Sequence, residues 1–192
     1  AAKRIIPIID IKNEINSNES SNRLILKEGN IAFNNVSFSY KSNFEKTAIE
    51  NISIRINGGK MTALVGHSGS GKSTLLNMIP RIYDPTLGSI SIDDQDLTKV
   101  NLSSLREQIS IVDQNTTLFD DTVLNNIKYA QPDASNRQIF EAAKLSMSED
   151  FINNLEQGYD TKIGENGVKL SGGERQRLSI ARAFLKKSRV IL

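Results

Sequence analysis

The sequence has no cysteine and only one histidine, His67. Without cysteine it can form neither a disulfide framework nor a thiolate metal site. No apolar run approaches the ~18 residues that would cross a bilayer, and no secretory signal pattern opens the chain. Neither sign of charge is in large excess, since the sequence has 24 Lys+Arg and 22 Asp+Glu. The net charge of +2 does not indicate a nucleic acid or an acidic membrane surface as a partner. We therefore expect a cytosolic protein, or the cytosolic part of something larger.

What is present fits a globular chain. Hydrophobic residues make up 38% of the 192 residues and charged residues 24%, which is typical of one soluble domain, or one domain with a small inserted lobe. Residues 1–30 look different. An apolar start broken by Pro7 is followed by a stretch rich in Asn, Ser and Glu at 12–23. That composition predicts a flexible connector.

Strand patterns begin at Ile31. Apolar residues alternate from Ile31 to Phe33 and again, in the opposite parity, from Val36 to Tyr40. The change of parity predicts a bulge or tight bend at Asn34-Asn35.

A second alternation at 52–56 predicts another strand. Asn57-Gly58 then gives a hairpin signal. The following run, Met61–Val65, is almost continuously apolar, as buried central strands are. We expect Met61–Val65 to be such a strand. Further short strands are predicted at 89–93, 109–112 and 189–192.

Helical spacing follows the glycine-rich segment, where Pro80 should end the first helix. Residues 122–157 predict a helical insertion, with capping signatures at Ser135-x-x-Gln138 and Ser146-x-x-Glu149. A longer helix should run from Ser171 to Lys187. Its basic residues are expected to form a solvated face; they are Arg175, Arg177, Arg182, Lys186 and Lys187.

The first functional motif is Gly66-His67-Ser68-Gly69-Ser70-Gly71-Lys72-Ser73, which matches a phosphate-binding loop in full. Glycines let the backbone curl so that N–H groups face phosphate oxygens, and the following helix adds its dipole. Lys72 can reach the terminal phosphates, Ser73 can ligate Mg²⁺, and Thr74 can add a phosphate contact. His67 occupies a variable loop position, which argues against a catalytic role.

The second motif is Leu170-Ser171-Gly172-Gly173-Glu174. Ser171 with Glu174 three residues later predicts a capping box. The two glycines of that first turn cost roughly 1 kcal/mol each relative to alanine. Helix stability therefore does not explain them, whereas close approach of an anion to bare backbone does.

Together these motifs resemble the nucleotide-binding domain of ABC transporters over about residues 31–192. The resemblance implies an α/β fold: a P-loop NTPase core with an antiparallel β lobe and an inserted helical subdomain at about 115–170, incomplete at the C-terminus. Residues 1–30 would be the linker from an absent transmembrane domain.

The resemblance also implies roles for individual residues. Tyr40 would stack on adenine, and Gln114 would act in catalysis with Lys72, touch Mg²⁺ with Ser73, and link to the membrane domain. Glu165 lies in Gly164–Gly167, which resembles the X-loop of exporters, and would take part with Gln114 in interdomain coupling. The nucleotide-binding residues would be Tyr40, Gly66, His67, Ser68, Gly69, Ser70, Gly71, Lys72, Ser73 and Thr74. The signature acting in trans would be Leu170, Ser171, Gly172, Gly173 and Glu174, with Glu174 where the family usually has Gln.

Exporters are favoured within the family by Arg81–Pro85 and Leu118–Val123, which resemble bacterial lipid A flippases and multidrug exporters. The implied protein pairs two such domains head to tail around ATP and Mg²⁺, without nucleic acid. It would lie on the cytoplasmic face of the plasma or inner membrane and power export of a lipid or another hydrophobic substrate through its transmembrane domains.

Three alternatives stay open. The family's Walker B Asp and Glu and its switch histidine follow a strand like Val190–Leu192, so the 192-residue chain alone is expected to bind nucleotide with little or no turnover. A DNA-repair or chromosome-type ABC ATPase would accommodate Glu174, but the compact spacing of the motifs, Gln114 and Gly164–Gly167 argue against it. A soluble phosphate-loop kinase has no use for Leu170–Glu174.

Overall fold

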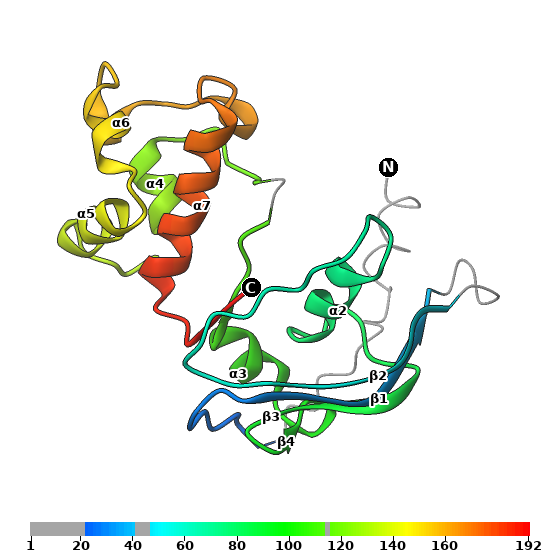
Figure 1. The fold of residues 1–192 in the computed structure, drawn as a ribbon. Coiled ribbons are helices and arrows are strands. Elements are labelled where there is room, and N and C mark those ends of the chain that lie inside the picture. The colour runs from blue at the N-terminus through cyan, green and yellow to red at the C-terminus, as the bar shows by residue number, and fades with distance from the viewer. Residues whose placement is uncertain (1–21, 41–46, 114–115) are drawn as a thin grey trace, which may run out of the picture. The chain divides into compact units, whose positions relative to one another are not determined.

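The computed structural model describes residues 22–40, 47–113 and 116–192 (Figure 1). The chain divides into two compact units, the first ending at Arg106 and the second beginning at Glu107. The first unit contains a four-stranded antiparallel sheet in the order β2-β1-β3-β4. Its elements are β1 (Ile31–Ser39), β2 (Thr47–Ile56), α2 (Lys72–Met78), β3 (Leu87–Ile92), β4 (Gln95–Asp96), the 3-10 turn η1 (Leu97–Lys99) and α3 (Leu102–Glu107).

The predicted bulge in β1 is confirmed. The pairing register of β1 with β2 shifts between Phe33 and Val36, and Asn35 takes a left-handed φ of 48°. Both Phe33 and Val36 are consequently buried, because the extra residue returns the apolar side chains to one face of the sheet.

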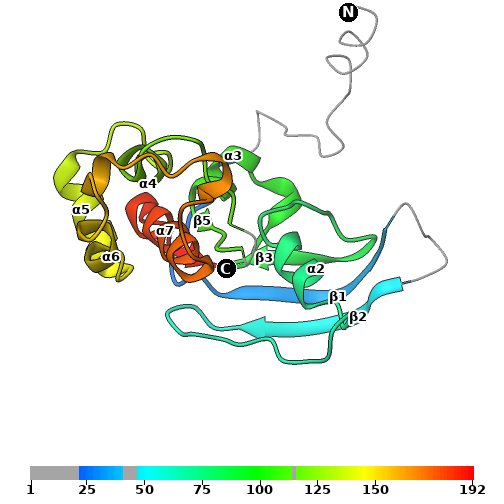
Figure 2. The same ribbon diagram turned by 90° about the horizontal axis from the view of Figure 1, so that it is seen from above.

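Helix α2 ends where the sequence predicts. Its C-cap is Ile79, immediately before Pro80. Met78 and Ile79 are buried, and Figure 2 shows α2 beside β1 and β2. The apolar end of the helix is therefore fixed to the core, while its first residues continue the glycine-rich loop.

The prediction for Met61–Val65 is wrong, and so is that of the hairpin at Asn57-Gly58. Residues 61–65 form no strand, and the side chains of Met61 and Val65 are 100% and 93% exposed. A strand needs a neighbour to satisfy its backbone groups, and none of the strands in the described part of the chain pairs with this run. The apolar composition of 61–65 predicts a buried strand, but these side chains are not buried among the described residues.

The second unit is mainly helical. Helices α4 and α5 pack against α7, and α6 packs against α5 (Figure 1). The parallel pair β5–β6 completes the unit. Its elements are β5 (Ile109–Ser110), α4 (Val123–Lys128), α5 (Asn136–Leu145), α6 (Glu149–Asn153), the 3-10 turns η2 (Gly158–Asp160) and η3 (Glu165–Gly167), α7 (Gly172–Lys186) and β6 (Val190–Ile191). The helices predicted within 122–157, the final helix and the short strands at 109–112 and 189–192 are confirmed.

One of the two predicted capping boxes of the insertion forms. Ser135 and Gln138 bond reciprocally at the start of α5. Ser146 instead ends α5, donating to the carbonyl of Ala143 and sharing a 2.7 Å hydrogen bond with Ser148. Met147, at a left-handed φ of 55°, reverses the chain, so α6 begins after Ser148, whose side chain makes no cap bond.

The core of the second unit is a single apolar cluster in which Ile127, Ile139, Ile152 and Leu178 are fully buried. It joins α4, α5 and α6 to α7. No helix of the described chain combines the length and apolarity needed to cross a bilayer.

Candidate nucleotide-binding site

The phosphate loop enters α2 through two left-handed glycines. Gly69 has a φ of 82° and Gly71, the N-cap of α2, a φ of 85°. A Cβ on Gly71 would stand 2.5 Å from the Ile49 Cδ1 atom and 2.9 Å from the Ala48 carbonyl oxygen. Gly71 is thus required both by backbone conformation and by its close approach to β2. Because glycine has no side chain, no side-chain cap accepts a hydrogen bond from the first N–H groups of α2.

The Lys72 ammonium lies over this loop. It donates to the carbonyl oxygens of Gly66 and His67 at 2.8 and 2.7 Å, and to the Ser70 hydroxyl at 3.3 Å. The loop therefore folds around its own cation. An anionic phosphate would compete for the same donors with charge-assisted hydrogen bonds, which are stronger than those to neutral carbonyls.

Two hydroxyls follow Lys72 and face different surroundings. Ser73 is exposed, whereas Thr74 is buried. The Thr74 hydroxyl and the Tyr40 hydroxyl share a hydrogen bond of 2.8 Å. Ser73 is consequently the hydroxyl open to a metal or phosphate, while Thr74 ties the loop helix to the end of β1.

The ring of Tyr40 belongs to an aromatic cluster. It meets Phe38 edge to face, with centroids 4.9 Å apart, and Tyr83 likewise at 5.4 Å. These contacts and the bond to Thr74 hold the ring beside α2. His67 has a local partner, since its Nδ1 atom lies 2.9 Å from the carbonyl oxygen of Ser68.

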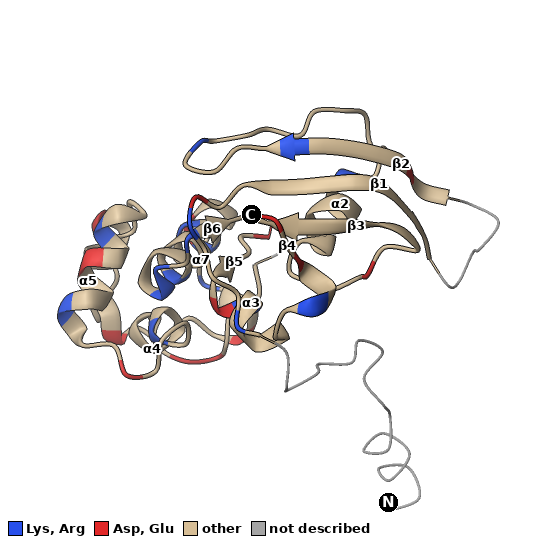
Figure 3. Cartoon of the chain, turned by 90° about the horizontal axis from the view of Figure 1, so that it is seen from below, with Lys and Arg blue, Asp and Glu red and all other residues tan. Residues whose placement is uncertain are grey.

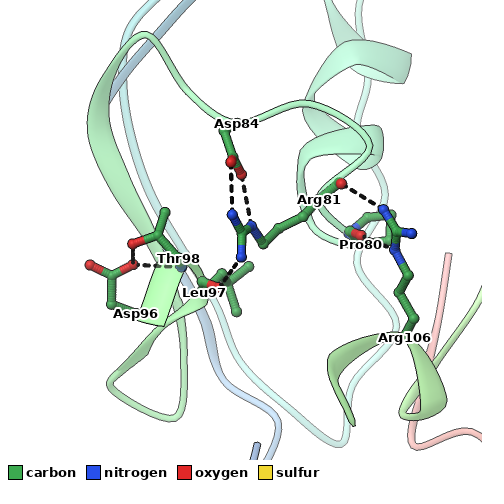
Figure 4. Close-up of polar contacts among 7 residues, drawn as sticks. All are labelled: Pro80, Arg81, Asp84, Asp96, Leu97, Thr98 and Arg106. Atoms are coloured by element: carbon green, nitrogen blue, oxygen red, sulfur yellow. Dashed lines mark hydrogen bonds and ion pairs between the residues drawn. The ribbon is translucent and has the colours of Figure 1, made fainter. Parts of the chain in front are cut away.

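Two arginines that sequence reasoning did not assign support the far end of α2 (Figure 4). Arg81, buried and at a left-handed φ of 54°, pairs with both oxygens of Asp84 at 2.8 Å and donates to the Leu97 carbonyl at 3.1 Å. Arg106 donates to the carbonyls of Pro80 and Arg81. The carbonyl groups after the helix thus receive cationic donors, which also suit its dipole. The sequence motif Arg81–Pro85 pointed to this region, but the spacing of its residues does not say what Arg81 contacts.

The second motif forms the predicted capping box at the start of α7. The backbone N–H and the hydroxyl of Ser171 donate to Glu174 Oε2 at 2.7 and 2.8 Å, and the Glu174 N–H donates back to Ser171 at 3.4 Å. Hydrogen bonds from the Ser171 backbone and side chain lower the pKa of Glu174, and they outweigh desolvation, which raises it. Glu174 is therefore a charged cap at neutral pH.

Gly172 and Gly173 expose the backbone of this first turn. A Cβ on either would meet only ordinary contacts, the Arg175 Nη2 atom at 3.9 Å and the Arg177 Nη1 atom at 3.6 Å. Packing does not require glycine here. The two positions leave a bare helix N-terminus flanked by guanidinium groups.

The segment before the signature is tightly packed at one residue. Glu165 is exposed at the start of η3, but Gly167 is buried and left-handed, with a φ of 66°. A Cβ on Gly167 would lie 2.7 Å from Leu118 Cδ1. Gln114 lies outside the described residues, so its predicted role stays a prediction.

The predicted solvated face of α7 needs correction. Basic residues recur along this helix (Figure 3), but only Lys187 of the five is exposed, and the other four are half-buried. Arg175 donates to the Leu170 carbonyl at 2.6 Å, and the Arg177 guanidinium lies 5.2 Å from the centre of the Phe151 ring. Long basic side chains can bury their stems and still place charged heads on carbonyls or ring faces. Charge alone therefore did not reveal their surroundings.

The described residues include no group of three or more His, Asp or Glu that could hold a metal ion. Magnesium seldom needs one, because it is commonly held by one or two protein oxygens together with substrate phosphates. The exposed Ser73 hydroxyl beside the cationic loop fits that pattern.

Comparisons with known proteins place these motifs in context. Residues 49–192 match the family model described as ABC transporter. The whole chain is 48% identical to the ATP-dependent lipid A-core flippase of Syntrophus aciditrophicus (strain SB), covering 31% of that protein. Over 98% of its length it is 45% identical to a putative multidrug export ATP-binding/permease protein of Staphylococcus aureus (strain NCTC 8325 / PS 47), covering 32% of it.

A solved structure agrees with these relatives. A bacterial Atm1-family ABC exporter with ATP bound superposes with a TM-score of 0.93 at 38% identity, over 99% of this chain and 33% of that one. The expected fold is confirmed. The chain spans about a third of the proteins it resembles.

Proposed function

We propose, on the premise that this chain belongs to the ABC transporter family, that it is the nucleotide-binding domain of an exporter and couples ATP binding and hydrolysis to transport. The observation that carries the proposal is the Lys72 ammonium held over the Gly66–Ser73 loop by that loop's own carbonyls. The similarity of the chain to a lipid A flippase and to a putative multidrug exporter supports a lipid or another hydrophobic molecule as the substrate. It also supports a position on the cytoplasmic side of a membrane, beside transmembrane domains of the same protein.

In this proposal the loop binds the phosphates of ATP. Lys72 exchanges its bonds to Gly66 and His67 for bonds to the terminal phosphates, and the free N–H groups of α2 bind the same anion. Ser73, with Gln114, would hold Mg²⁺, which neutralises phosphate charge when bound. Tyr40 would present its ring to adenine while its hydroxyl stays on Thr74.

The Ser171–Glu174 turn serves a second copy of the domain. Its glycines have no packing role, and their exposed backbone suits an anion brought by a partner. We propose a head-to-tail pair in which the phosphate loop of each copy faces the signature of the other. Glu174 supplies the cap and keeps its charge within the capping box.

The 192-residue chain by itself is proposed to bind nucleotide and to hydrolyse it slowly or not at all. The run that leads into the phosphate loop, Met61–Val65, has no strand partner among the described residues and is largely exposed. A loop carried on an unpaired run can close on a ligand, but it is poorly held for chemistry that depends on exact positioning.

Binding is tested by thermal unfolding of the chain with and without Mg-ATP, comparing wild type, K72A and the control K60A. Lys60 is exposed and lies before the loop. Each tenfold excess of ATP over Kd should add about 1.4 kcal/mol, which raises Tm by roughly 2–4 °C per kcal/mol. Wild type and K60A should shift and K72A should not. Equal shifts in all three would contradict the site.

Sharing of the site is tested by mixing K72A with G172R in the intact transporter. The readout is ATP turnover, because the intact phosphate loop of G172R should still bind nucleotide. In a head-to-tail dimer, random pairing leaves about a quarter of wild-type sites intact, so the mixture should recover turnover although neither variant turns over ATP alone. Turnover by neither the variants nor their mixture would mean that each site is built within one copy. Turnover of the isolated chain above that of its K72A variant would overturn the proposal of low activity.

A further inference from the structure

Arg182 lies in the C-terminal half of α7, about two turns beyond the signature, and donates from all three guanidinium nitrogens to the segment 117–126. Its Nε donates to the Asn126 carbonyl at 2.7 Å, one terminal nitrogen to the Thr117 carbonyl at 2.7 Å, and the other to Asn126 Oδ1 at 2.8 Å. Desolvation by burial lowers the pKa of Arg182, opposed by the nearby Tyr129. Because all three of these acceptors are neutral, the contacts of Arg182 set the position of the segment 117–126 relative to α7 and do not neutralise a charge.

Asn126, which accepts two of these hydrogen bonds, is fully buried. We call the hydrogen-bonded contact of Arg182 with Thr117 and Asn126 the joint. Besides accepting from Arg182, Asn126 Oδ1 accepts from the Phe119 N–H at 2.9 Å. Its Nδ2 donates to the carbonyls of Phe119 and Thr122 at 3.0 and 2.9 Å. The amide therefore uses all four of its hydrogen-bonding positions.

Aromatic rings cover the joint. The rings of Phe119 and Tyr129 are 4.5 Å apart, and the Arg182 guanidinium lies 5.6 and 5.9 Å from their centres. Cation–π contacts of this kind favour a planar guanidinium over an ammonium group. Lysine at position 182 would keep the charge but could not reproduce the fork.

One turn later, the end of α7 contacts the chain that precedes Gln114 in the sequence. Lys186 donates to the Ile109 carbonyl at 2.6 Å, and Ser110 shares a 2.7 Å hydrogen bond with Ser188. Thr117 and Ile109 flank Gln114 in the sequence. Helix α7 thus holds the chain on both sides of the residue proposed to face the nucleotide and the membrane domain.

We propose that Arg182 and Asn126 are positioning residues that make the segment 117–126 and the signature helix α7 move as one body. This inference rests on the proposed function. It follows from the network itself: a buried, fully bonded polar joint has one geometry, whereas an apolar contact at the same place would permit sliding. Displacement of the chain after Gln114 is then transmitted to Ser171–Glu174 instead of being absorbed between them.

The test compares R182K, N126L and R182K/N126L with wild type and with the control R137K in the intact transporter in lipid vesicles. Arg137 is exposed on α5. R182K and N126L should each lower kcat for ATP about tenfold with KM within about twofold. Because the two residues act as a unit, the double variant should be no slower than the slower single variant. R137K should match wild type.

Two results would contradict the proposed role of the joint. One is a kcat of R182K within twofold of that of wild type. The other is a fall in kcat fully accounted for by loss of folded protein, which the unfolding transition of each variant measures. Hydrogen exchange supplies a readout independent of turnover: the Phe119 amide should exchange about tenfold faster in R182K, and unchanged protection refutes the joint. Failure of the proposed function is distinct, because it appears as wild-type turnover that K72A does not abolish.

Discussion

Both carboxylate oxygens of Asp93 accept a hydrogen bond from the N–H of Gly29, each at 3.0 Å. The same carboxylate also accepts from the N–H groups of Lys27, Glu28 and Asn30. Four consecutive backbone donors therefore converge on one side chain in the turn after β3. Asp93 fixes the chain that enters the first unit, just past the stretch that composition identifies as a connector.

Replacing Asp93 with asparagine should destabilise the protein. The amide keeps one acceptor oxygen and tolerates the left-handed φ of 49°, but it places N–H donors against other donors. We expect a loss of about 1–2 kcal/mol, below the value for a fully buried charged acceptor because solvent screens the site. Urea unfolding at pH 7 measures it, and D94N is the matched control, since Asp94 also has a positive φ but is exposed. Equal stability of D93N and wild type would show that the four donors are equally well served by water.

Acid should remove the same contribution. Desolvation raises the pKa of Asp93, but the hydrogen bonds from Gly29, Lys27, Asn30 and Glu28 together hold it below the usual value. A folded-state pKa below the unfolded one means that the stabilisation is complete above about pH 5 and is lost as pH falls through about 4 and below. Wild type should therefore lose more stability than D93N between pH 5 and pH 3. Parallel pH profiles for the two proteins would contradict this assignment.

Removing the Arg81 side chain should weaken the support of α2. R81M leaves Asp84 and the Leu97 carbonyl without their donor in a largely buried place, and we expect a cost of about 2–3 kcal/mol. Arg55, exposed on β2, provides the control R55M, which should stay within about 0.5 kcal/mol of wild type. Denaturant unfolding compares them. A cost for R81M no larger than that for R55M would mean that the apolar contacts of α2 suffice.

The cap of α7 should distinguish its two partners. S171A removes the hydroxyl that accepts from and donates to Glu174, at a cost of about 1 kcal/mol. E174Q keeps an oxygen acceptor and loses only the charge at the helix N-terminus, about 0.5 kcal/mol. The difference between E174Q and wild type should shrink as pH falls below about 4, where Glu174 becomes protonated. Both are measured by urea unfolding from pH 7 to pH 3; a larger loss in E174Q than in S171A would reverse the order.

Much of the site was predictable from sequence because its motifs are local. Gly66–Ser73 and Ser171–Glu174 each form within a few residues: glycines set the backbone of the loop, and a hydroxyl and a carboxylate three residues apart close a capping box. The same locality explains the bulge at Asn34-Asn35 and the end of α2 before Pro80.

The failures have a common cause. Met61–Val65 has the composition of a buried strand, but strand formation depends on a hydrogen-bonding neighbour that composition cannot specify. Ser146 matched a capping pattern, yet the turn at Met147 moved the start of α6. Both outcomes depend on hydrogen-bond partners that composition and spacing do not name: a neighbouring strand for Met61–Val65, and the Ala143 carbonyl and Ser148 for Ser146.

By itself the sequence determined the family, the glycine-rich loop and the cap of α7, because each depends on residues that are neighbours along the chain. Only the tertiary structure decided the surroundings of the basic residues on α7 and the partners of Asp93 and Arg81. A guanidinium or carboxylate carries the same charge in solvent and in a buried joint. What distinguishes the two is the set of backbone carbonyls or N–H groups that folding brings within about 3 Å of it.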